Sequence, residues 1–365
     1  MVNSHYIPQF ILRSFCNDNK ILYCDIDNKI VETRNTRSVF AEKGYYPEQI
    51  EKDLCSNIEY DFSVLYHNKL EKPGYSLTLS EDELYILKKY LIVSSIRYKY
   101  EYTQFELDYL DELGDSFKPD FVNNLNKVLH AKNSNELFDI LEKVDDYQKK
   151  MIQNFKATGN LLVDERLDDQ NINMSLWAEV RDILYSYVVF IKASGSEKFV
   201  IPDTGKGIYE GPMSRRKLTG LIQNTLTHQN PALMQIMLML TPHDYTIYPL
   251  TKDIAILSMS VFFKLFTDSE VKSNIILPED CPTVSSMLGF GSRNDIAPPK
   301  VRINRGKKEY RYNINRLNSR DISHFNCLMM AEAKHHFAFS DINDISNSLK
   351  LTKKYSDRDF DFLID

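Results

Sequence analysis

His5 is the first residue of the sequence whose type and position could serve chemistry. It stands three residues before Pro8, and because proline favours the first turn of a helix, the histidine just ahead of it can be held rigidly. An imidazole titrates near neutral pH, which suits general-base catalysis or metal binding. We expect His5 to act in one of these ways, with Gln9 and Arg13 of the same run contacting the substrate. The alternative is a histidine that caps or packs at the chain terminus.

Glu51 and Glu59 form a second candidate, with Cys55 between them. Spacings of four and eight residues place all three near one face of a helix. Two carboxylates on one face could hold a divalent metal ion such as Mg²⁺. The same spacing also describes a solvated stripe beside an apolar one, so both interpretations stay open.

Asp203 follows the strand-like run Lys198–Pro202 and precedes Gly205. Catalytic carboxylates often lie on loops at strand ends, which makes Asp203 a candidate partner for a catalytic histidine. An aspartate that caps the backbone of its own loop is at least as common.

Basic residues gather in two segments, Arg215–Lys217 and a denser stretch that contains Lys300, Arg302, Arg305, Lys307, Lys308 and Arg311. Cations contact phosphates and interleaved tyrosines can stack on bases, so we expect Arg302, Lys307 and Lys308 to bind RNA or DNA. The net charge of −6 means that such binding would use a local patch. The alternation from Val301 onward is also typical of an exposed strand or hairpin.

The last predicted helix, Ser319–Phe337, carries several polar residues: Arg320, His324, Asn326, His335 and His336. The R-x(4–6)-H signature of HEPN ribonucleases is not met, because only three residues separate Arg320 from His324. Adjacent helical positions point about 100° apart, so His335 and His336 do not easily bind one ion. We expect Asn326 to contact the substrate and the histidines to lie on a polar face or interface.

Several classes of protein are excluded by missing patterns. The sequence has no G-x-x-x-x-G-K-[ST] loop, no G-x-S-x-G elbow, no H-E-x-x-H and no G-x-G-x-x-G after a strand. Its five cysteines form no CxxC pair, and no apolar run is long enough to span a membrane. We expect a cytoplasmic protein with reduced thiols. A nuclease is not excluded, since nuclease sites assemble from scattered residues.

The elements that must position these residues follow from periodicity. After an amphipathic start at 1–16, the first half is predicted to contain the strands Lys20–Ile26 and Lys29–Thr33. A helix over 47–70 follows, and a second helix begins at a capping box at Ser80 and runs to about Glu112. Further helices are predicted near 116–130, 134–157 and 173–193. The second half is predicted to contain strands Lys198–Pro202, Asp244–Pro249 and Ile254–Met259, a helix over 214–227, a loop over 281–305 and the final helix.

These elements predict an α+β fold. A predominantly helical body would carry a small N-terminal β-hairpin and a short sheet in the C-terminal half, from 197–260 and 300–313. We treat 1–365 as a single domain that could subdivide into 1–195 and 196–365. We also expect the N-terminal run to pack against the C-terminal half, because a site containing His5 and Asp203 needs that contact.

The chain resembles the bacterial DUF4238 family, a domain of unknown function. The run from His5 through Pro8, Gln9 and Phe10 to Phe15 is similar to the family's opening H-x-x-P-[QR]-F-x-L-x-x-F pattern. Further similarities lie at Tyr45-Tyr46, Ile50-Glu51, Ile58-Glu59, Arg97, Phe199–Asp203, Tyr248–Leu250, Asn326, Ala331–Ala333 and Phe339-Ser340. The residue before Asp203 is Pro202 where the family usually has Ser or Thr, and the proline expected soon after Asp203 is absent.

This resemblance implies no established activity, but some family members occur in bacterial antiviral loci. Our first hypothesis is therefore a nucleic-acid-cleaving defence effector. His5 would be its base or metal ligand, Asp203 the partner carboxylate and Arg97 the cation that stabilises phosphate charge. The alternative is a non-enzymatic sensor or scaffold that recognises a phage protein as its trigger.

Overall fold

The computed structural model of the chain describes residues 3–43, 48–97, 117–158, 174–209, 245–259, 309–355 and 360–363. Several predicted features lie outside these residues: the helix at 214–227 with its basic start, the loop at 281–305, and Arg302, Lys307 and Lys308. The helix predicted to run from Ser80 to about Glu112 is described as far as Arg97.

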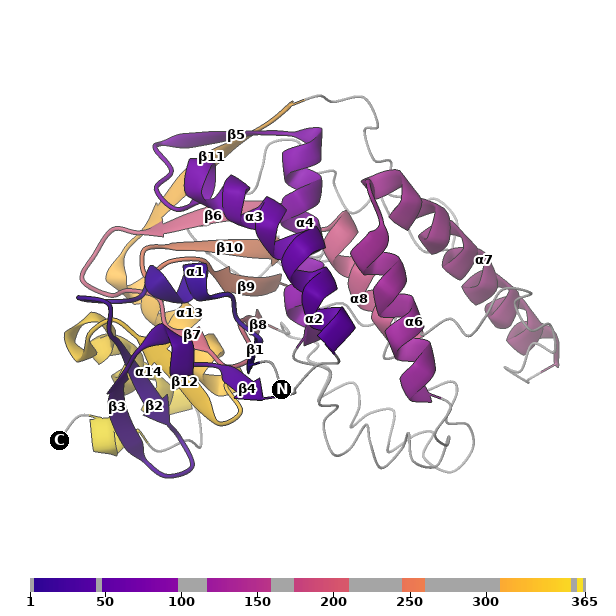
Figure 1. Cartoon of the computed structure of the whole chain (residues 1–365). Helices are drawn as coiled ribbons and strands as arrows, with labels where there is room; N and C mark the ends of the chain where they lie inside the picture. Colours follow the sequence, from indigo (N-terminus) through magenta and orange to yellow (C-terminus); the bar gives the residue numbers. More distant parts are fainter. Residues whose placement is uncertain are drawn as a thin grey trace.

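A six-stranded mixed sheet forms the centre of the described structure (Figure 1). In sheet order its strands are β5 (Ser76–Ser80), β11 (Glu309–Leu317), β6 (Tyr187–Ala193), β10 (Ile254–Met259), β9 (Tyr245–Pro249) and β8 (Gly207–Tyr209). Neighbours are antiparallel except β11 and β6, which run parallel. Every residue of β10 is buried, as expected for a strand covered on both faces.

The predicted architecture is wrong in its sheets. The main sheet is large and mixed rather than a short C-terminal one, and it recruits β5 from the first quarter of the chain. The helix predicted over 173–193 is in fact α8 (Met174–Tyr185) followed by the strand β6. A continuous apolar run does not distinguish a buried strand from a buried helix by its period, and this ambiguity hid β6.

A four-stranded sheet joins the two ends of the chain. Its order is β3 (Ile30–Arg34), β2 (Ile21–Asp25), β12 (His336–Phe339) and β7 (Ile201–Pro202). The predicted N-terminal hairpin is present as β2 and β3, with Lys29 in the left-handed region at a φ of 54°. It is not a separate unit, because the other edge of β2 pairs with β12. A small pair, β1 (Asn3–His5) with β4 (Ala41–Lys43), lies beside it.

One continuous helical segment covers the predicted helix over 47–70. It consists of α2 (Glu48–Leu54), the π-helical η2 (Cys55–Glu59), α3 (Tyr60–Leu65) and the π-helical η3 (Tyr66–Leu70). Its apolar stripe is buried at Leu54, Ile58, Phe62 and Leu65, as the periodicity predicts.

The capping box predicted at Ser80 opens α4 (Glu81–Arg97). Ser80 N donates to Glu83 Oε2 at 2.8 Å, and Glu83 N donates to Ser80 Oγ at 3.2 Å. Lys69 Nζ donates to the same Glu83 oxygen at 2.7 Å. Burial acts to raise the pKa of the Glu83 carboxyl, but the Lys69 ammonium and the Ser80 hydrogen bonds outweigh it and hold the pKa below its usual range.

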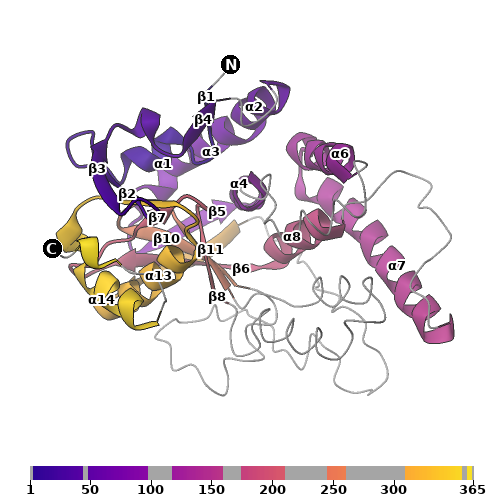
Figure 2. The same ribbon diagram turned by 90° about the horizontal axis from the view of Figure 1, so that it is seen from below.

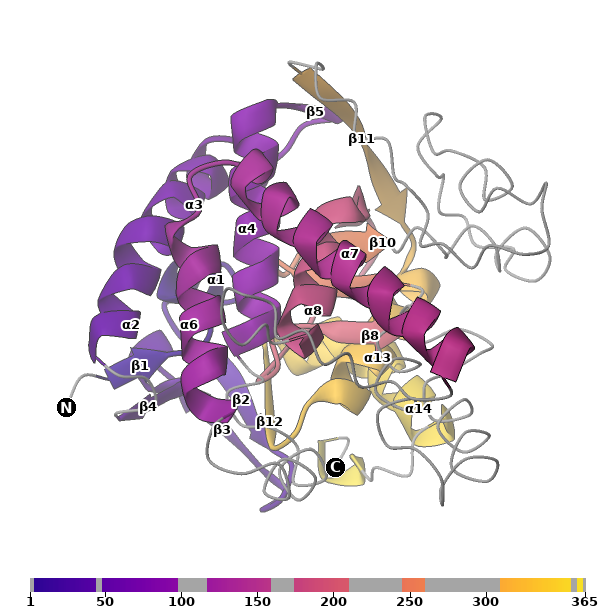
Figure 3. The same ribbon diagram turned by 90° about the vertical axis from the view of Figure 1, so that its right-hand side faces the viewer.

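The remaining described elements are α1 (Gln9–Arg13), η1 (Thr36–Ser38), α6 (Phe117–His130), α7 (Ser134–Thr158), α13 (Ser319–Glu332), η5 (Ile342–Ile345), α14 (Ser346–Tyr355) and η6 (Asp361–Leu363). α6, α7 and α8 lie on the side of α4 away from the four-stranded sheet (Figure 2). When the molecule is viewed from the side that carries α6 and α7, these two helices lie in front of α4 and α8 (Figure 3).

Two adjacent lysines on α4 cap the C-terminal ends of α8 and α6. Lys88 serves α8 and Lys89 serves α6, and their ammonium groups donate to the carbonyls of Leu184 (2.5 Å), Ser186 (2.8 Å), Leu129 (2.9 Å) and Ala131 (2.7 Å). The last carbonyls of a helix lack intrahelical donors, and each lysine nitrogen supplies N–H donors to two of them. Consecutive positions on α4 point in different directions, which lets the two lysines reach two helices.

These lysines predict a rise in stability on the alkaline side of neutrality. Burial lowers the pKa of Lys88 to about 7 and that of Lys89 to about 8, against about 10.4 for an unfolded lysine. Between about pH 8 and pH 10 the unfolded chain therefore binds more protons than the folded chain, and the free energy of unfolding increases with pH, by about 1 kcal/mol or more. Denaturant unfolding across this range measures the increase.

The matched variants are Lys88→Met and Lys350→Met. Lys88→Met removes one of the two titrating groups and should flatten the increase, whereas Lys350 is exposed on α14 and its replacement should leave the increase intact. An increase of equal size in both variants would contradict the assignment to the buried lysine.

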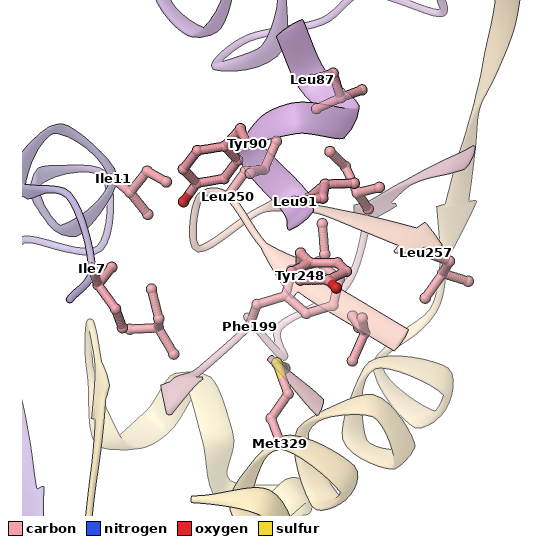
Figure 4. Close-up of a cluster of buried hydrophobic side chains, with 14 of the residues drawn as sticks. Ile7, Ile11, Leu87, Tyr90, Leu91, Phe199, Tyr248, Leu250, Leu257 and Met329 are labelled. Atoms are coloured by element: carbon pink, nitrogen blue, oxygen red, sulfur yellow. The ribbon is translucent and has the colours of Figure 1, made fainter. Parts of the chain in front are cut away.

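The hydrophobic core connects the N-terminal run to the sheet and to α4. Figure 4 shows Ile7 and Ile11 facing Tyr90 and Leu91 of α4 beside Tyr248, and all five side chains are buried. Full burial of an aliphatic side chain stabilises the fold by roughly 1.5–3 kcal/mol. The N-terminal run therefore packs on the C-terminal half, as expected.

Candidate functional site

Asp203 lies at the end of β7, and its buried carboxylate binds the backbone of a distant turn. Its oxygens accept hydrogen bonds from the backbone N–H groups of Lys334 (2.9 Å), His335 (2.8 Å) and His336 (2.9 Å). Asp203 N in turn donates to His336 O at 2.9 Å. The side chain thus caps backbone, which was the alternative interpretation, but the backbone belongs to residues more than 130 positions later.

We call residues Lys334–His336 the histidine turn. The helix predicted to reach Phe337 ends at Glu332, because Ala333 leaves the helical region with φ −58° and ψ 131°. His336 begins β12, so His335 and His336 are not on a helix as predicted. Asp203 fixes the turn by its three N–H contacts, and the turn presents two imidazoles.

Each imidazole of the histidine turn faces a carboxylate of the β2–β3 hairpin. His335 Nδ1 lies 2.6 Å from Asp27 Oδ2, with both side chains more than half exposed. His336 Nε2 lies 3.7 Å from Asp25 Oδ2, and its Nδ1 lies 3.9 Å from Asp203 Oδ2. The two rings have centroids 6.1 Å apart. Two proton carriers therefore lie side by side, each with an acidic partner.

Asp25 is held in its charged form by local contacts. Partial burial acts to raise the pKa of its carboxyl, but hydrogen bonds from Asn28 and the nearby His336 outweigh this and lower it. The Asn28 backbone N–H and side-chain amide each donate to Asp25 at 2.9 Å. The hairpin turn thus orients the carboxylate that faces His336.

An aromatic chain links the histidine turn to the N-terminal run. His336 stacks on Tyr23 with ring centroids 4.8 Å apart, Tyr23 contacts Phe40 at 5.6 Å, and Phe40 contacts Tyr6 at 5.9 Å. The Arg34 guanidinium also lies over the Tyr23 ring, 4.2 Å from its centroid. Burial raises the pKa of the Tyr23 hydroxyl well above its usual value, so Tyr23 stays neutral and serves as a platform.

His5 lies in β1, next to Tyr6 of this row of aromatic rings, and pairs with Ala41 of β4. Its Nε2 lies 3.3 Å from the amide nitrogen of Gln9, the residue that was predicted to contact the substrate. Arg13 is exposed at the end of α1. Arg97 is the last residue of α4, and its side chain is outside the described part of the chain.

The loop after Asp203 lies between the N-terminal run and α4. Gly205 has a φ of +67°, a conformation that favours glycine, and a Cβ there would lie 3.5 Å from Ser94 Oγ and 3.8 Å from Ile7 Cγ1. Ile7, two residues after His5, thus lies beside the loop that follows Asp203.

Lys206 on the same loop extends a buried polar network. Its ammonium lies 3.2 Å from Glu179 Oε1 and 2.6 Å from Ser95 Oγ, and Ser95 Oγ lies 2.8 Å from the Tyr248 hydroxyl. Burial, and secondarily the charge of Glu179, raises the pKa of Tyr248 far above its usual value. The network fastens β8, β9, α4 and α8 to one another at their buried faces.

A further predicted site residue, Asn326, has a structural role. Asn326 on α13 is fully buried, and its amide pins the segment before β7: Oδ1 accepts from Val200 N at 3.1 Å, while Nδ2 donates to Lys198 O at 2.7 Å and to Ser348 Oγ at 2.9 Å. These contacts occupy the amide that was predicted to bind substrate.

The predicted metal pair, Glu51 and Glu59, lies on α2 and η2, with Cys55 Sγ 3.9 Å from Glu59 Oε2. Among the described residues, no three or more His, Cys, Asp or Glu side chains are grouped so that they could hold a metal ion. The two glutamates therefore gain no third ligand from the described part of the chain.

A family model described as a protein of unknown function, DUF4238, matches residues 3–343. The chain belongs to the DUF4238 family. No curated protein and no solved structure matches it. No helix in the described ranges is long and apolar enough to cross a membrane.

The match confirms the resemblance seen in the opening His5–Phe15 pattern, and it covers every residue of the site described above. Three residues of this DUF4238 protein match family motifs: His5, Asp203 and Asn326. Each of them contacts backbone or a neighbouring side chain. His335 and His336 were expected to lie on a polar face or interface, and Asp25 and Asp27 were assigned no role in a site. The signal that could have indicated them is the pair of aspartates, Asp25 and Asp27, at the start of a tight hairpin turn.

Proposed function

We propose that this DUF4238 protein cleaves phosphodiester bonds of nucleic acid as an effector of bacterial antiviral defence. The defence role follows from the family resemblance. The cytoplasmic location follows from the sequence, whose five cysteines form no CxxC pair and which has no apolar run long enough to span a membrane. The chemistry follows from the histidine turn, where two imidazoles lie side by side and face three carboxylates. Phosphodiester cleavage needs a base that removes a proton from the nucleophile and an acid that protonates the leaving oxygen.

His335 is suited to the role of base. Asp27 engages its Nδ1 at 2.6 Å, so Nε2 is the nitrogen through which the ring would exchange a proton with a substrate. A carboxylate that fixes the tautomer and orientation of a histidine is the arrangement used by many hydrolytic bases. The imidazole is 57% exposed and can be reached by a polymer.

His336 is suited to the role of acid. Its Nε2 lies 3.7 Å from Asp25 Oδ2 and its Nδ1 lies 3.9 Å from Asp203 Oδ2, both beyond hydrogen-bond distance, so a ring nitrogen can still give a proton to a substrate oxygen. Asp203 is a positioning residue in this proposal, because its carboxylate holds the backbone of both histidines. His5 supports the same region through the aromatic chain and is not the proton carrier.

The test uses purified protein with total RNA and plasmid DNA, with and without Mg²⁺, and with and without extract of phage-infected cells. His335→Gln and His336→Gln should each lower the cleavage rate by roughly 10²-fold or more at an unchanged melting temperature. His130→Gln, at an exposed histidine on α6, is the control and should cleave at the parent rate. Absence of cleavage in every condition, or undiminished cleavage by the double variant, would reject the proposal.

A non-enzymatic sensor that recognises a phage protein is the second candidate. One observation favours it: β3 is an edge strand of its sheet within the described residues, with Ile30 47% and Val31 37% exposed. Such an edge can pair with an extended segment of a partner. A sensor should keep phage protection in His335→Gln and lose it when Ile30 and Val31 are replaced by lysine. The enzyme should show the reverse pattern.

A further inference from the structure

The two imidazoles of the histidine turn have a spacing that fits one phosphate group. Their ring centroids are 6.1 Å apart, and a proton carrier works within about 3 Å of the oxygen that it serves. Rings at this separation can reach two different oxygens bonded to the same phosphorus. They can therefore serve the attacking oxygen and the leaving oxygen of a single displacement.

One cation lies near His336. The Arg34 guanidinium lies over the Tyr23 ring on which His336 stacks, 4.2 Å from the ring centroid, and its Nε donates to Glu32 Oε2 at 2.8 Å. A guanidinium has further N–H donors, so it can still contact a phosphate oxygen whose negative charge increases in the transition state.

The nucleophile remains to be supplied, and ribose carries one. The 2′-hydroxyl of RNA is covalently fixed next to the phosphate, and intramolecular attack gains a large effective concentration, on the order of 10⁵ M or more. A site built from a base and an acid needs nothing further from the substrate than this hydroxyl. DNA lacks it, so the same groups would give DNA no comparable route.

We infer that the substrate of the histidine turn is RNA and that cleavage proceeds by attack of the 2′-hydroxyl. This inference rests on the proposed function. His335 takes the proton from O2′ as O2′ bonds to phosphorus, and the bond from phosphorus to O5′ breaks. His336 gives its proton to O5′. The products are a 2′,3′-cyclic phosphate and a 5′-hydroxyl, with no change in oxidation state.

The experiment compares three single-stranded oligonucleotides of one sequence: RNA, fully 2′-O-methylated RNA and DNA. The protein should cleave the RNA at least roughly 10²-fold faster than either of the others. The upstream RNA fragment should end in a 2′,3′-cyclic phosphate by mass spectrometry. In H₂¹⁸O this first product should contain no ¹⁸O, because water does not attack the phosphorus.

The outcomes separate the inference from the proposed function. Cleavage of DNA and methylated RNA at the RNA rate, or ¹⁸O in the first product, overturns the 2′-hydroxyl route and leaves a nuclease in place. Cleavage of none of the three, with or without infected-cell extract, overturns both. RNA cleavage that His335→Gln and His336→Gln do not slow, while His130→Gln behaves as the parent, removes the histidine turn as its source.

Discussion

Replacing Asp203 with alanine is expected to destabilise the fold by about 3 kcal/mol or more and to abolish the cleavage proposed for the histidine turn. The change removes one buried carboxylate but leaves three backbone donors, of Lys334, His335 and His336, without their acceptor. A hydrogen bond to a charged group is worth about 1.5–3 kcal/mol, and a buried donor without a partner costs about 1–3 kcal/mol. Chemical denaturation measures the loss of stability.

Asp203→Asn separates the carboxylate's charge from its shape. The amide retains one oxygen, but its nitrogen faces backbone N–H groups and cannot accept from them, so an intermediate loss of stability is expected. The imidazole of His336 lies 3.9 Å from Asp203 Oδ2, so the ring chemical shifts of His336 should change in the NMR spectrum of this variant. The His130 ring signals should stay at their parent positions once the variant is folded.

Asp341→Ala is the matched control. Asp341 also caps backbone, since its Oδ1 accepts from Asn343 N at 2.9 Å, but it does so at the exposed start of η5. Its removal should cost about 1 kcal/mol. If the two variants lose equal stability, the three contacts of Asp203 are not the anchor of the histidine turn.

Local signals in the sequence predicted the local structure well. The capping box at Ser80, the hairpin at Asp27-Asn28 and the apolar stripe that includes Phe62 each depend on residues a few positions apart, and each is present. The family resemblance, carried by the run that starts at His5, is confirmed as well.

Features set by distant partners were not predictable in the same way. β6 is a strand because β10 and β11 flank it, and its apolar run is equally compatible with a helix. The helix before the histidine turn ends at Glu332, and Asp203, at the other end of a long chain segment, binds the turn that follows it. No periodicity reports such a contact. The large sheet and the true environment of His335 and His336 were missed for this reason.

Asp203 itself illustrates the boundary between the two cases. A strand followed by an aspartate and a glycine-bearing loop marked the residue as a candidate for catalysis. Its partners are backbone N–H groups, which every residue other than proline carries, so the sequence held no information about which ones it would bind. The residue was identified, whereas its role required the fold.

The buried pair of Lys206 and Glu179 carries the second large expected effect. Their charged atoms are 3.2 Å apart, and their side chains are only 7% and 10% exposed. Glu179→Leu leaves the ammonium of Lys206 buried without this counterion. Removal of one partner of a buried pair costs about 3–5 kcal/mol, so Glu179→Leu should lose stability in that range, measured as the free energy of unfolding in denaturant.

The double variant Glu179→Leu/Lys206→Met decides whether charge pairing is the cause. Replacing both partners with apolar residues of similar volume removes the uncompensated charge, and such replacements are often neutral or stabilising. Its loss should therefore be smaller than that of Glu179→Leu alone, because Ser95 keeps the Tyr248 hydroxyl as a partner at 2.8 Å. Losses that simply add would show that the two side chains act independently.

A coupled pair would instead mean that the loop from Asp203 to Gly207 is held at both ends by buried charge: at one end by a carboxylate on backbone N–H groups, at the other by an ammonium on a carboxylate. Two such anchors on five residues give the histidine turn a rigid support, which acid–base chemistry at fixed geometry requires.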